Sequence, residues 1–152
     1  MTGAVGDGEV EWAVPHGLAV GMVATTLPDG TPAMRLPYGE HLIGDPDSGV
    51  VHGGVITTLL DQTCGMVARP PDASREESAI ATLDLRIDYM GPATPGRDLW
   101  ATGECYKRTP NIAFVRAWAF HDSPADPVAT CVAAFMMGTP NTPRGETPRG
   151  AA

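Results

Sequence analysis

Hydrophobic and polar residues alternate along the second half of the chain in a way that predicts β-strands. Residues 80–90 alternate strictly, with one face formed by Ala81, Leu83, Leu85, Ile87 and Tyr89. Three further strand-like runs follow at 99–108, 112–120 and 128–137, separated by turns rich in Gly, Pro and Asp. Because short links join these four consecutive runs, we predict that they form an antiparallel meander.

The first half of the chain predicts two short strands and one long helix. Residues 20–38 have the pattern of two strands around a Pro-Asp-Gly turn, and residues 39–54 form a loop rich in Gly, Pro and Asp. A helical pattern covers residues 54–69 and ends before Pro70 and Pro71. One helix can cover one face of a sheet, so we predict an α+β fold in which an antiparallel sheet curls round a single central helix.

The length of 152 residues suits one domain with its own core. We expect the folded domain over residues 16–139, a flexible N-terminal segment over 1–15 and a disordered tail rich in Thr, Pro, Arg and Gly over 140–152. No apolar run approaches the ~20 residues that cross a bilayer, and the N-terminus lacks the pattern of a signal peptide. We therefore expect a cytoplasmic protein.

The formal net charge of −8 argues against a general affinity for nucleic acid or for anionic membranes. A few local arginines could still hold an anionic ligand. Cys64, Cys105 and Cys131 are widely spaced and belong to no Cys/His cluster, so the sequence predicts neither a disulfide framework nor a metal site. We expect these cysteines to be buried, reduced thiols.

One carboxylate stands out in the predicted helix, because Asp61 is the only charged residue between Gly53 and Ala68. On a helical wheel the expected core stripe consists of Val55, Ile56, Leu59, Leu60, Met66 and Val67. The opposite arc places Asp61 among uncharged residues: Thr57, Thr58, Gln62, Cys64, Gly65 and Ala68. Since an exposed helix face normally carries Lys, Glu and Arg, we expect another subunit, a ligand or both to cover this arc. Asp61 is then either a general base or a structural carboxylate paired with a neighbouring donor, and the wheel alone leaves both open.

Two glycines, Gly53 and Gly54, follow His52 at the start of this helix. Their backbone N–H groups have no acceptor within the helix and lie at the positive end of its dipole, where they can bind an oxyanion that develops on a carbonyl. Asp61 follows two turns later, about 12 Å along the axis of an α-helix, so the two groups of one chain cannot serve one atom. An antiparallel helix of a partner subunit would bring them together.

These features belong to one pattern: His-Gly-Gly at residues 52–54, an acid nine positions after the His, and the strand T-x-D-L-x-I-x-Y at 82–89. The pattern resembles the PaaI-type acyl-CoA thioesterases of the hotdog superfamily, and the resemblance covers about residues 16–139. It implies the hotdog fold, in which a curved antiparallel sheet wraps round one long helix, and a homodimer that commonly pairs into a homotetramer. It also implies hydrolysis of an acyl-CoA to the free acid and coenzyme A, with coenzyme A present only as part of the substrate and no metal or other cofactor.

The resemblance implies roles for individual residues. Asp61 matches the catalytic acid, which acts as general base or nucleophile, and the backbone N–H of Gly53 matches the group that polarises the thioester carbonyl. His52 matches a residue that shapes the loop near the thioester, and Thr82 matches a Ser or Thr that positions the attacking water. A purely structural turn histidine and an ordinary β-branched strand residue are equally good interpretations of these two. Asp45 stands where the family has an Asn before His-Gly-Gly; it cannot donate as an amide does, and its alternative role is to form a turn.

Substrate-binding residues are implied by the resemblance as well. The turn that follows the predicted strand 99–108 lies near the expected mouth of the pantetheine tunnel, so Arg108 and Asn111 are candidates for binding coenzyme A, with a solvated turn as the alternative. We also assign Gly54 to substrate binding through its N–H, and Met90 as a tunnel-lining residue whose alternative is core packing. An aryl, short-chain or medium-chain acyl group is the expected substrate.

Two other functions stay open from the sequence. A hotdog domain can bind acyl-CoA or an acyl carrier protein without catalysis, and the Asp at position 45 slightly favours this class. Hotdog hydratases and dehydratases pair a His with an acid in a different loop-and-helix context, which His52 and Asp61 fit less well.

Overall fold

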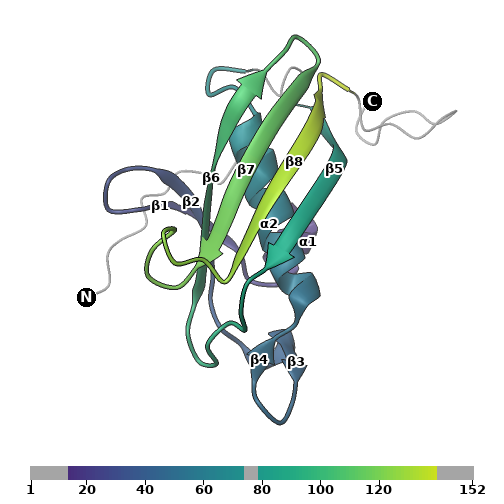
Figure 1. Cartoon of the computed structure of the whole chain (residues 1–152). Coiled ribbons are helices and arrows are strands. Elements are labelled where there is room, and N and C mark those ends of the chain that lie inside the picture. Colours follow the sequence, from purple (N-terminus) through teal and green to yellow (C-terminus); the bar gives the residue numbers. More distant parts are fainter. Residues whose placement is uncertain (1–13, 74–78, 140–152) are drawn as a thin grey trace, which may run out of the picture.

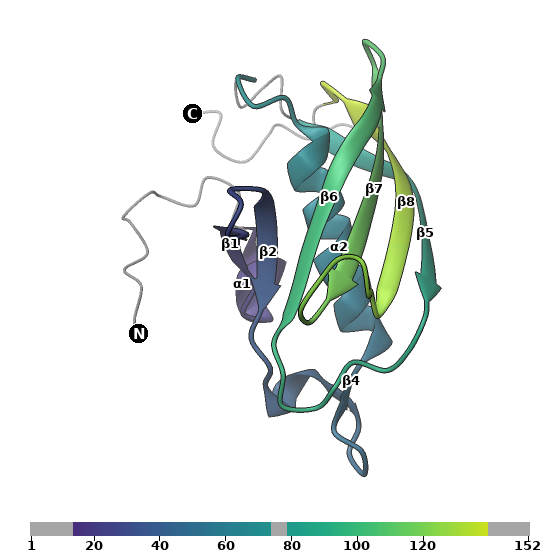
Figure 2. The ribbon, with the colours of Figure 1, turned by 60° about the vertical axis from the view of Figure 1, so that its left-hand side comes forward.

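A single long helix lies against the concave face of a curved antiparallel sheet (Figures 1 and 2). The structure is a computed structural model that describes residues 14–73 and 79–139. The long helix is α2 (Gly53–Ala68), and a short helix, α1 (Pro15–Ala19), precedes the sheet. The sheet contains six strands: β1 (Val23–Thr26), β2 (Pro32–Leu36), β5 (Ile80–Tyr89), β6 (Leu99–Arg108), β7 (Ile112–Phe120) and β8 (Ala129–Met137). The predicted α+β architecture, with one helix wrapped by a sheet, is confirmed.

The order of strands in the sheet is β1-β2-β6-β7-β8-β5, and every neighbouring pair is antiparallel. The predicted meander is confirmed for β6, β7 and β8, but it is wrong for β5, which pairs with β8. β5 cannot pair with β6, because β7 occupies one edge of β6 and β2 occupies the other, for example at Leu36↔Leu99. The connection over residues 90–98 runs from β5, at the edge of the sheet, to β6 in its interior. The consecutive strands β5 and β6 are therefore not neighbours.

A β-bulge in β5 decides which of its side chains face the helix. The register with β8 shifts after Thr82, which pairs with the buried Phe135. The inserted residue, Leu83, is 52% exposed. Because one inserted residue reverses the alternation, Thr82 faces the same side as Leu85, whose partner Ala133 is buried. The strict alternation predicted for this strand is therefore wrong before the bulge, and the change turns Thr82 toward α2.

Small residues on the inner face of β7 let the sheet approach α2 closely. The larger side chains Phe114 and Trp118 lie on the outer face, where they are half-buried. The inner positions are fully buried: Ala113, Val115, Ala117 and Ala119. The core of the domain therefore lies between this strand, its neighbours and α2, with Leu59 and Leu60 of the helix fully buried within it.

Gly103 of β6 lies so close to β7 that a side chain has no room. A Cβ atom there would lie 2.7 Å from the carbonyl oxygen of Arg116 and 3.0 Å from the Cβ of Ala117. The backbone of β7 would have to move, so we expect Gly103→Ala to lower the free energy of unfolding by about 1–3 kcal/mol, the usual cost of overpacking. Urea unfolding followed by circular dichroism measures this loss. Gly91→Ala is the control, because no atom lies within 4 Å of a Cβ at that position, and equal losses in both variants would contradict the prediction.

The buried face of α2 is rotated from the predicted core stripe. Three residues of that stripe are buried: Ile56, Leu59 and Leu60. The other three are only half-buried: Val55, Met66 and Val67. Cys64 and Ala68, which the wheel placed on the opposite arc, are fully buried, and the Sγ of Cys64 lies 3.3 Å from that of Cys131 in β8. Contact with Cys131, followed by burial, raises the pKa of the Cys64 thiol. The sheet of the same chain therefore covers part of the arc that was expected to need a partner or ligand.

The predicted loop over residues 39–54 contains short elements that the sequence pattern did not indicate. These elements are η1 (Glu40–Leu42), β3 (Ile43–Asp45) and β4 (Val50–Val51). β3 and β4 pair as a separate two-stranded hairpin, which projects from the end of the molecule where α2 begins (Figure 1). The hairpin thus frames the N-terminus of the long helix.

Most of the predicted terminal segments, residues 1–13 and 140–152, lie outside the described residues. α1 begins at Pro15, next to the predicted start of the folded domain. No helix in the described part of the chain has the length and apolar character needed to cross a membrane.

Candidate active site

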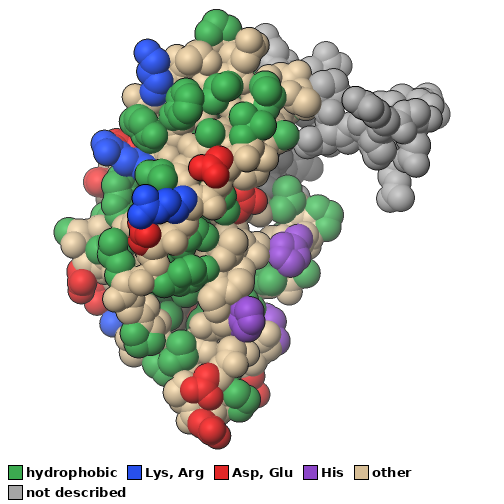
Figure 3. Space-filling model, turned by 45° about the vertical axis from the view of Figure 1, so that its right-hand side comes forward, with side chains coloured by type: hydrophobic (Ala, Val, Ile, Leu, Met, Phe, Trp, Pro, Cys, Tyr) green, Lys and Arg blue, Asp and Glu red, His purple; other side chains and the backbone are tan. Residues whose placement is uncertain are grey.

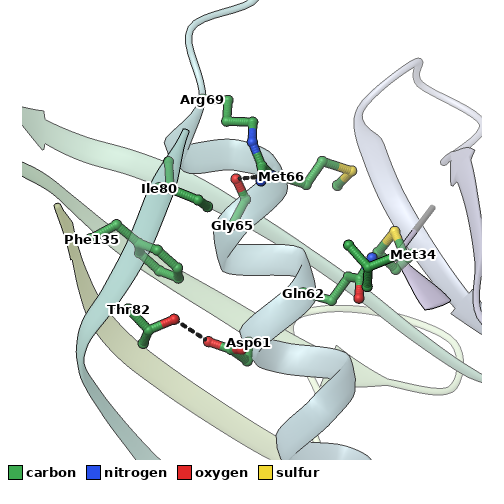
Figure 4. A pocket seen from close by; sticks show the side chains of 10 residues that line it. Met34, Asp61, Gln62, Gly65, Met66, Arg69, Ile80, Thr82 and Phe135 are labelled. Carbon is green, nitrogen blue, oxygen red and sulfur yellow. Dashed lines mark hydrogen bonds between the residues drawn. The ribbon is translucent and has the colours of Figure 1, made fainter. Parts of the chain in front are cut away.

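Asp61 and Thr82 form the central pair of the candidate site. Asp61 lies in the middle of α2, and the bulge in β5 turns Thr82 toward it. The Thr82 hydroxyl donates a hydrogen bond to Oδ1 of Asp61 at 3.0 Å (Figure 4). The other carboxylate oxygen, Oδ2, makes no hydrogen bond within the described residues. A half-buried carboxylate with one oxygen held and the other open can accept a proton from a water molecule.

A pocket of about 190 Å³ opens beside Asp61. In Figure 4, Ile80, Phe135 and Thr82 lie on one side of α2, whereas Met34 and Gln62 lie on the other. The lining is mostly apolar and includes Val14, Met34, Gly65, Met66, Ile80 and Phe135. A Cβ at Gly65 would lie 3.1 Å from Cδ1 of Ile80, so the absence of a side chain there helps to keep the pocket open. A ligand whose apolar part fills this pocket can place its polar end at Asp61.

The start of α2 holds the three residues of the His-Gly-Gly motif. His52 is the N-cap, and its Nδ1 accepts a hydrogen bond from the Gly54 N–H at 2.8 Å. The Gly53 N–H has no recorded acceptor among the residues that the structure describes. β3 packs against the cap, because a Cβ at Gly44 would lie only 2.7 Å from the Cα of His52. The geometry therefore gives His52 a capping role and leaves the Gly53 N–H available to a ligand.

Asp45 lies at the end of β3, and its carboxylate belongs to its own turn. It accepts a hydrogen bond from the Ser48 hydroxyl at 2.5 Å and another from the Asp47 N–H at 3.1 Å. The bond from Ser48, followed by that from Asp47, lowers the pKa of the Asp45 carboxyl. In Figure 3, acidic side chains gather at the tip of the molecule where this hairpin lies. These contacts fit the turn-forming alternative for Asp45.

The predicted coenzyme A-binding residues lie at opposite ends of α2. Arg108 donates a hydrogen bond from Nη1 to the carbonyl of Ala68, the last residue of the helix, and Asn111 lies in the exposed turn between β6 and β7. Met90 lies at the other end and is 60% exposed. It follows Tyr89, whose hydroxyl contacts the first turn of the helix. Its exposure argues against core packing. A helix of 16 residues is about 24 Å long, so within one chain these residues cannot contact the same small group.

The structure brings further residues to the site that the sequence did not single out. They are Gln62, Arg69 and Phe135 at the pocket and Tyr89 at the start of α2. The Arg69 guanidinium donates to the Gly65 carbonyl at 3.0 Å, and burial lowers its pKa. Gln62 and Arg69 follow Asp61 at helical spacing on α2 and its C-cap, so the helical pattern is a signal that could have grouped them with it. Phe135 comes from β8, and no local pattern could connect it with α2. Tyr89 closes the motif strand, and its place in that motif is the one signal that could have identified it.

Comparisons with known sequences agree with this geometry. The model of the Thioesterase superfamily matches residues 48–128, which contain Asp61 and Thr82. The medium/long-chain acyl-CoA thioesterase YigI of Escherichia coli is 28% identical over 108 residues, which cover 64% of this chain and 68% of YigI. The protein VNG_1336C of Halobacterium salinarum is 36% identical over 81 residues, which cover 51% of this chain and 54% of that protein. This chain therefore spans about half the length of the Halobacterium relative.

Solved structures extend the likeness to the whole fold. A crystal structure of a Pseudomonas aeruginosa protein has 46% sequence identity and a TM-score of 0.66, covering 80% of this chain and 88% of that one. The Bacillus halodurans protein BH2602, solved with CoA, has 25% identity and a TM-score of 0.70, covering 84% of this chain and 80% of that one. The resemblance to hotdog thioesterases is confirmed at the level of the family, whose model matches more than half of the chain. The protein belongs to the Thioesterase superfamily.

Proposed function

We propose that this protein is an acyl-CoA thioesterase, which hydrolyses an acyl-CoA to the free acid and coenzyme A. The observation that carries the proposal is the Asp61–Thr82 pair at an apolar pocket, with one oxygen of the carboxylate open to water. YigI, which is named an acyl-CoA thioesterase, and the structure of BH2602 with CoA support this substrate class. The pocket's walls of methionine, isoleucine and phenylalanine favour an aryl or a short- to medium-chain acyl group.

Asp61 is proposed to act as the general base. Its free oxygen takes a proton from water as the water oxygen attacks the thioester carbon, and the carbonyl oxygen becomes an oxyanion. The tetrahedral intermediate collapses, the C–S bond breaks, and the coenzyme A thiolate receives the proton from Asp61. In the alternative path, the carboxylate of Asp61 attacks the same carbon and expels the thiolate, and water then hydrolyses the mixed anhydride.

The Gly53 N–H is proposed to donate to the oxyanion. It lies at the positive end of α2, where a developing negative charge is stabilised. Gly53 and Asp61 of one chain are separated by about 12 Å along the helix axis, so one thioester cannot reach both. We therefore propose that Gly53 of the partner subunit faces Asp61 in a homodimer, which further pairs into a homotetramer. The end position of β5 in the sheet gives a second copy a strand edge on which to assemble.

Coenzyme A is proposed to bind through three of the predicted residues, Arg108, Asn111 and Met90. Gly54 does not fit its predicted role, because its N–H is already donated to Nδ1 of His52. Arg108 donates one N–H to the carbonyl of Ala68. A guanidinium has five N–H groups in all, so the remaining ones are available to donate to a phosphate. Met90 is exposed at the Gly53 end, where pantetheine would approach the thioester. The proposed chemistry requires no metal or redox cofactor, and it assigns no catalytic step to Asp45, whose oxygens serve its turn.

A thiol-release assay tests the function directly. Purified protein is incubated with a panel of aryl-, short-, medium- and long-chain acyl-CoAs, and a thiol reagent follows the free coenzyme A. Release with saturation kinetics on at least one substrate supports the proposal. Saturable binding without release would instead support the second candidate, a non-catalytic module that binds acyl-CoA or an acyl carrier protein; the turn-forming contacts of Asp45 are the observation that favours it.

Removing the Thr82 hydroxyl should slow turnover without unfolding the protein. Thr82→Val keeps the β-branched shape in an exposed strand position but deletes the 3.0 Å hydrogen bond that fixes Oδ1 of Asp61. We expect kcat to fall by about tenfold, which corresponds to one lost hydrogen bond to a charged group. Steady-state kinetics measure the effect, and Thr130→Val, a change on the outer face of β8, is the matched control. An unchanged kcat in Thr82→Val would remove Thr82 from the mechanism.

A further inference from the structure

Tyr89, the last residue of β5, reaches across to the first turn of α2. Its hydroxyl lies 2.9 Å from the carbonyl oxygen of Gly53 and 2.6 Å from Oγ1 of Thr57. Oγ1 of Thr57 itself lies 3.1 Å from the same carbonyl oxygen. Two hydroxyl groups from different elements therefore converge on the carbonyl of the Gly53–Gly54 peptide, which directly follows the peptide whose N–H is proposed to bind the oxyanion.

The number of hydroxyl hydrogens decides which hydrogen bonds this cluster can form. Three short contacts join the three oxygens, but the two hydroxyls carry only two hydrogens. If both hydroxyls donated to Gly53, their oxygens would lie 2.6 Å apart with no hydrogen between them. The favourable arrangement is a chain in which one hydroxyl donates to the other and the second donates to the Gly53 carbonyl. In either direction, Tyr89 and Thr57 act as one unit that ends on Gly53.

The first turn of α2 needs such an anchor, because it begins with two glycines. Glycine has more backbone freedom than any other residue, and the N–H groups of a first helical turn lack partners within the helix. His52 holds the Gly54 N–H through Nδ1, and the Tyr89–Thr57 unit holds the Gly53 carbonyl, so both ends of the Gly53–Gly54 peptide are held. The Gly53 N–H belongs to the preceding His52–Gly53 peptide, whose carbonyl accepts from the Val55 N–H at 2.9 Å. Because the peptides on both sides of the Gly53 Cα are held, the direction of the Gly53 N–H is fixed.

We propose that Tyr89 is a positioning residue for the thioesterase reaction, whose hydroxyl, acting with Thr57, holds the Gly53–Gly54 peptide and so fixes the backbone conformation of Gly53 in which its N–H points at the substrate carbonyl. The inference rests on the proposed function of this site. Packing alone does not account for a tyrosine here, because the residue is 52% exposed while its hydroxyl makes both contacts. Its ring lies 3.6 Å from the position that a Cβ of Gly53 would occupy, so the aromatic wall also closes one side of the turn.

Tyr89→Phe tests the proposal because it deletes the hydroxyl and keeps the ring. We expect kcat to fall by about three- to tenfold, the effect of one hydrogen bond, with KM within twofold of the wild type. Amide hydrogen exchange should become faster in the peptide that contains Gly53 and Gly54, while the melting temperature changes little. Tyr106→Phe is the matched control, because Tyr106 has the same exposed fraction of 52% and its hydroxyl makes no recorded hydrogen bond within the described residues.

The outcomes separate this proposal from the function on which it rests. If the wild type releases thiol and Tyr89→Phe keeps its kcat, the role of Tyr89 is overturned while the thioesterase stands. A fall in kcat accompanied by faster exchange throughout α2 and a lower melting temperature overturns it too, because Tyr89 is then only structural. If the wild type releases no thiol from any acyl-CoA, the proposed function fails, and the positioning role fails with it. A lower kcat, with faster amide hydrogen exchange confined to the first turn of α2, supports both the thioesterase function and the positioning role of Tyr89.

Discussion

The Asp61→Asn variant should lose thioesterase turnover by about 10²–10⁴-fold, the usual contribution of a general base, while it folds as the wild type does. Asparagine keeps the size of the side chain and retains an oxygen that can accept the hydrogen bond from Thr82. It cannot take a proton from water or attack a thioester as a carboxylate does. The half-buried position leaves little reason for a loss of stability, so the defect should appear in kcat alone.

Single-turnover and steady-state thiol release measure this defect on the best acyl-CoA of the panel. Asp84→Asn provides the matched control, because it makes the same chemical change at an exposed position next to the β5 bulge. The control should retain its kcat, and both variants should melt within a few degrees of the wild type. Turnover by Asp61→Asn at the wild-type rate would remove Asp61 from the chemistry and leave the pocket as a binding site only.

The sequence predicted the elements of the fold better than their arrangement. Alternation and turn residues located α2 and the four long strands, because each element is specified by side chains close together in the chain. The neighbour of β5 could not be read in this way. It depends on β2 occupying the edge of β6, and that contact joins residues more than sixty positions apart, such as Leu36 and Leu99. The rotation of α2 has a similar cause, since the contact of Cys64 with Cys131 involves a distant strand.

The same distinction explains what could be predicted of the site. Asp61 and the His-Gly-Gly motif lie on one local stretch, and the lack of charge around Asp61 made it visible. The pairing of Thr82 with Asp61 depends on the bulge at Leu83, which strict alternation cannot reveal. Arg108 shows the converse: the resemblance suggested a ligand contact, and the fold in addition brings its guanidinium to the carbonyl of Ala68 at the end of α2, which has no acceptor role within the helix. Local motifs thus identified chemical groups, and tertiary contacts decided their partners.

Gly53→Pro should lower kcat by about 10²–10³-fold, the typical cost of losing one oxyanion-hole donor. Proline deletes the backbone N–H, and the first position of a helix is where proline is best tolerated. The preceding residue, His52, already has the extended conformation that proline requires, with φ −60° and ψ 133°. A Cβ at position 53 would meet no atom closer than the Tyr89 ring at 3.6 Å. Thermal unfolding should therefore show a stability close to that of the wild type.

Two comparisons make the Gly53→Pro result specific. Gly53→Ala adds a Cβ at the same position but keeps the N–H, so a much smaller loss in this variant attributes the effect to the donor. Mixing Gly53→Pro with Asp61→Asn subunits under exchange conditions then tests whether one site uses two chains. A mixed dimer would hold one site with both groups intact, and random pairing should restore about a quarter of the wild-type rate. Failure to recover activity, with subunit exchange verified, would place Gly53 and Asp61 of the same chain in one site and contradict the proposed dimer.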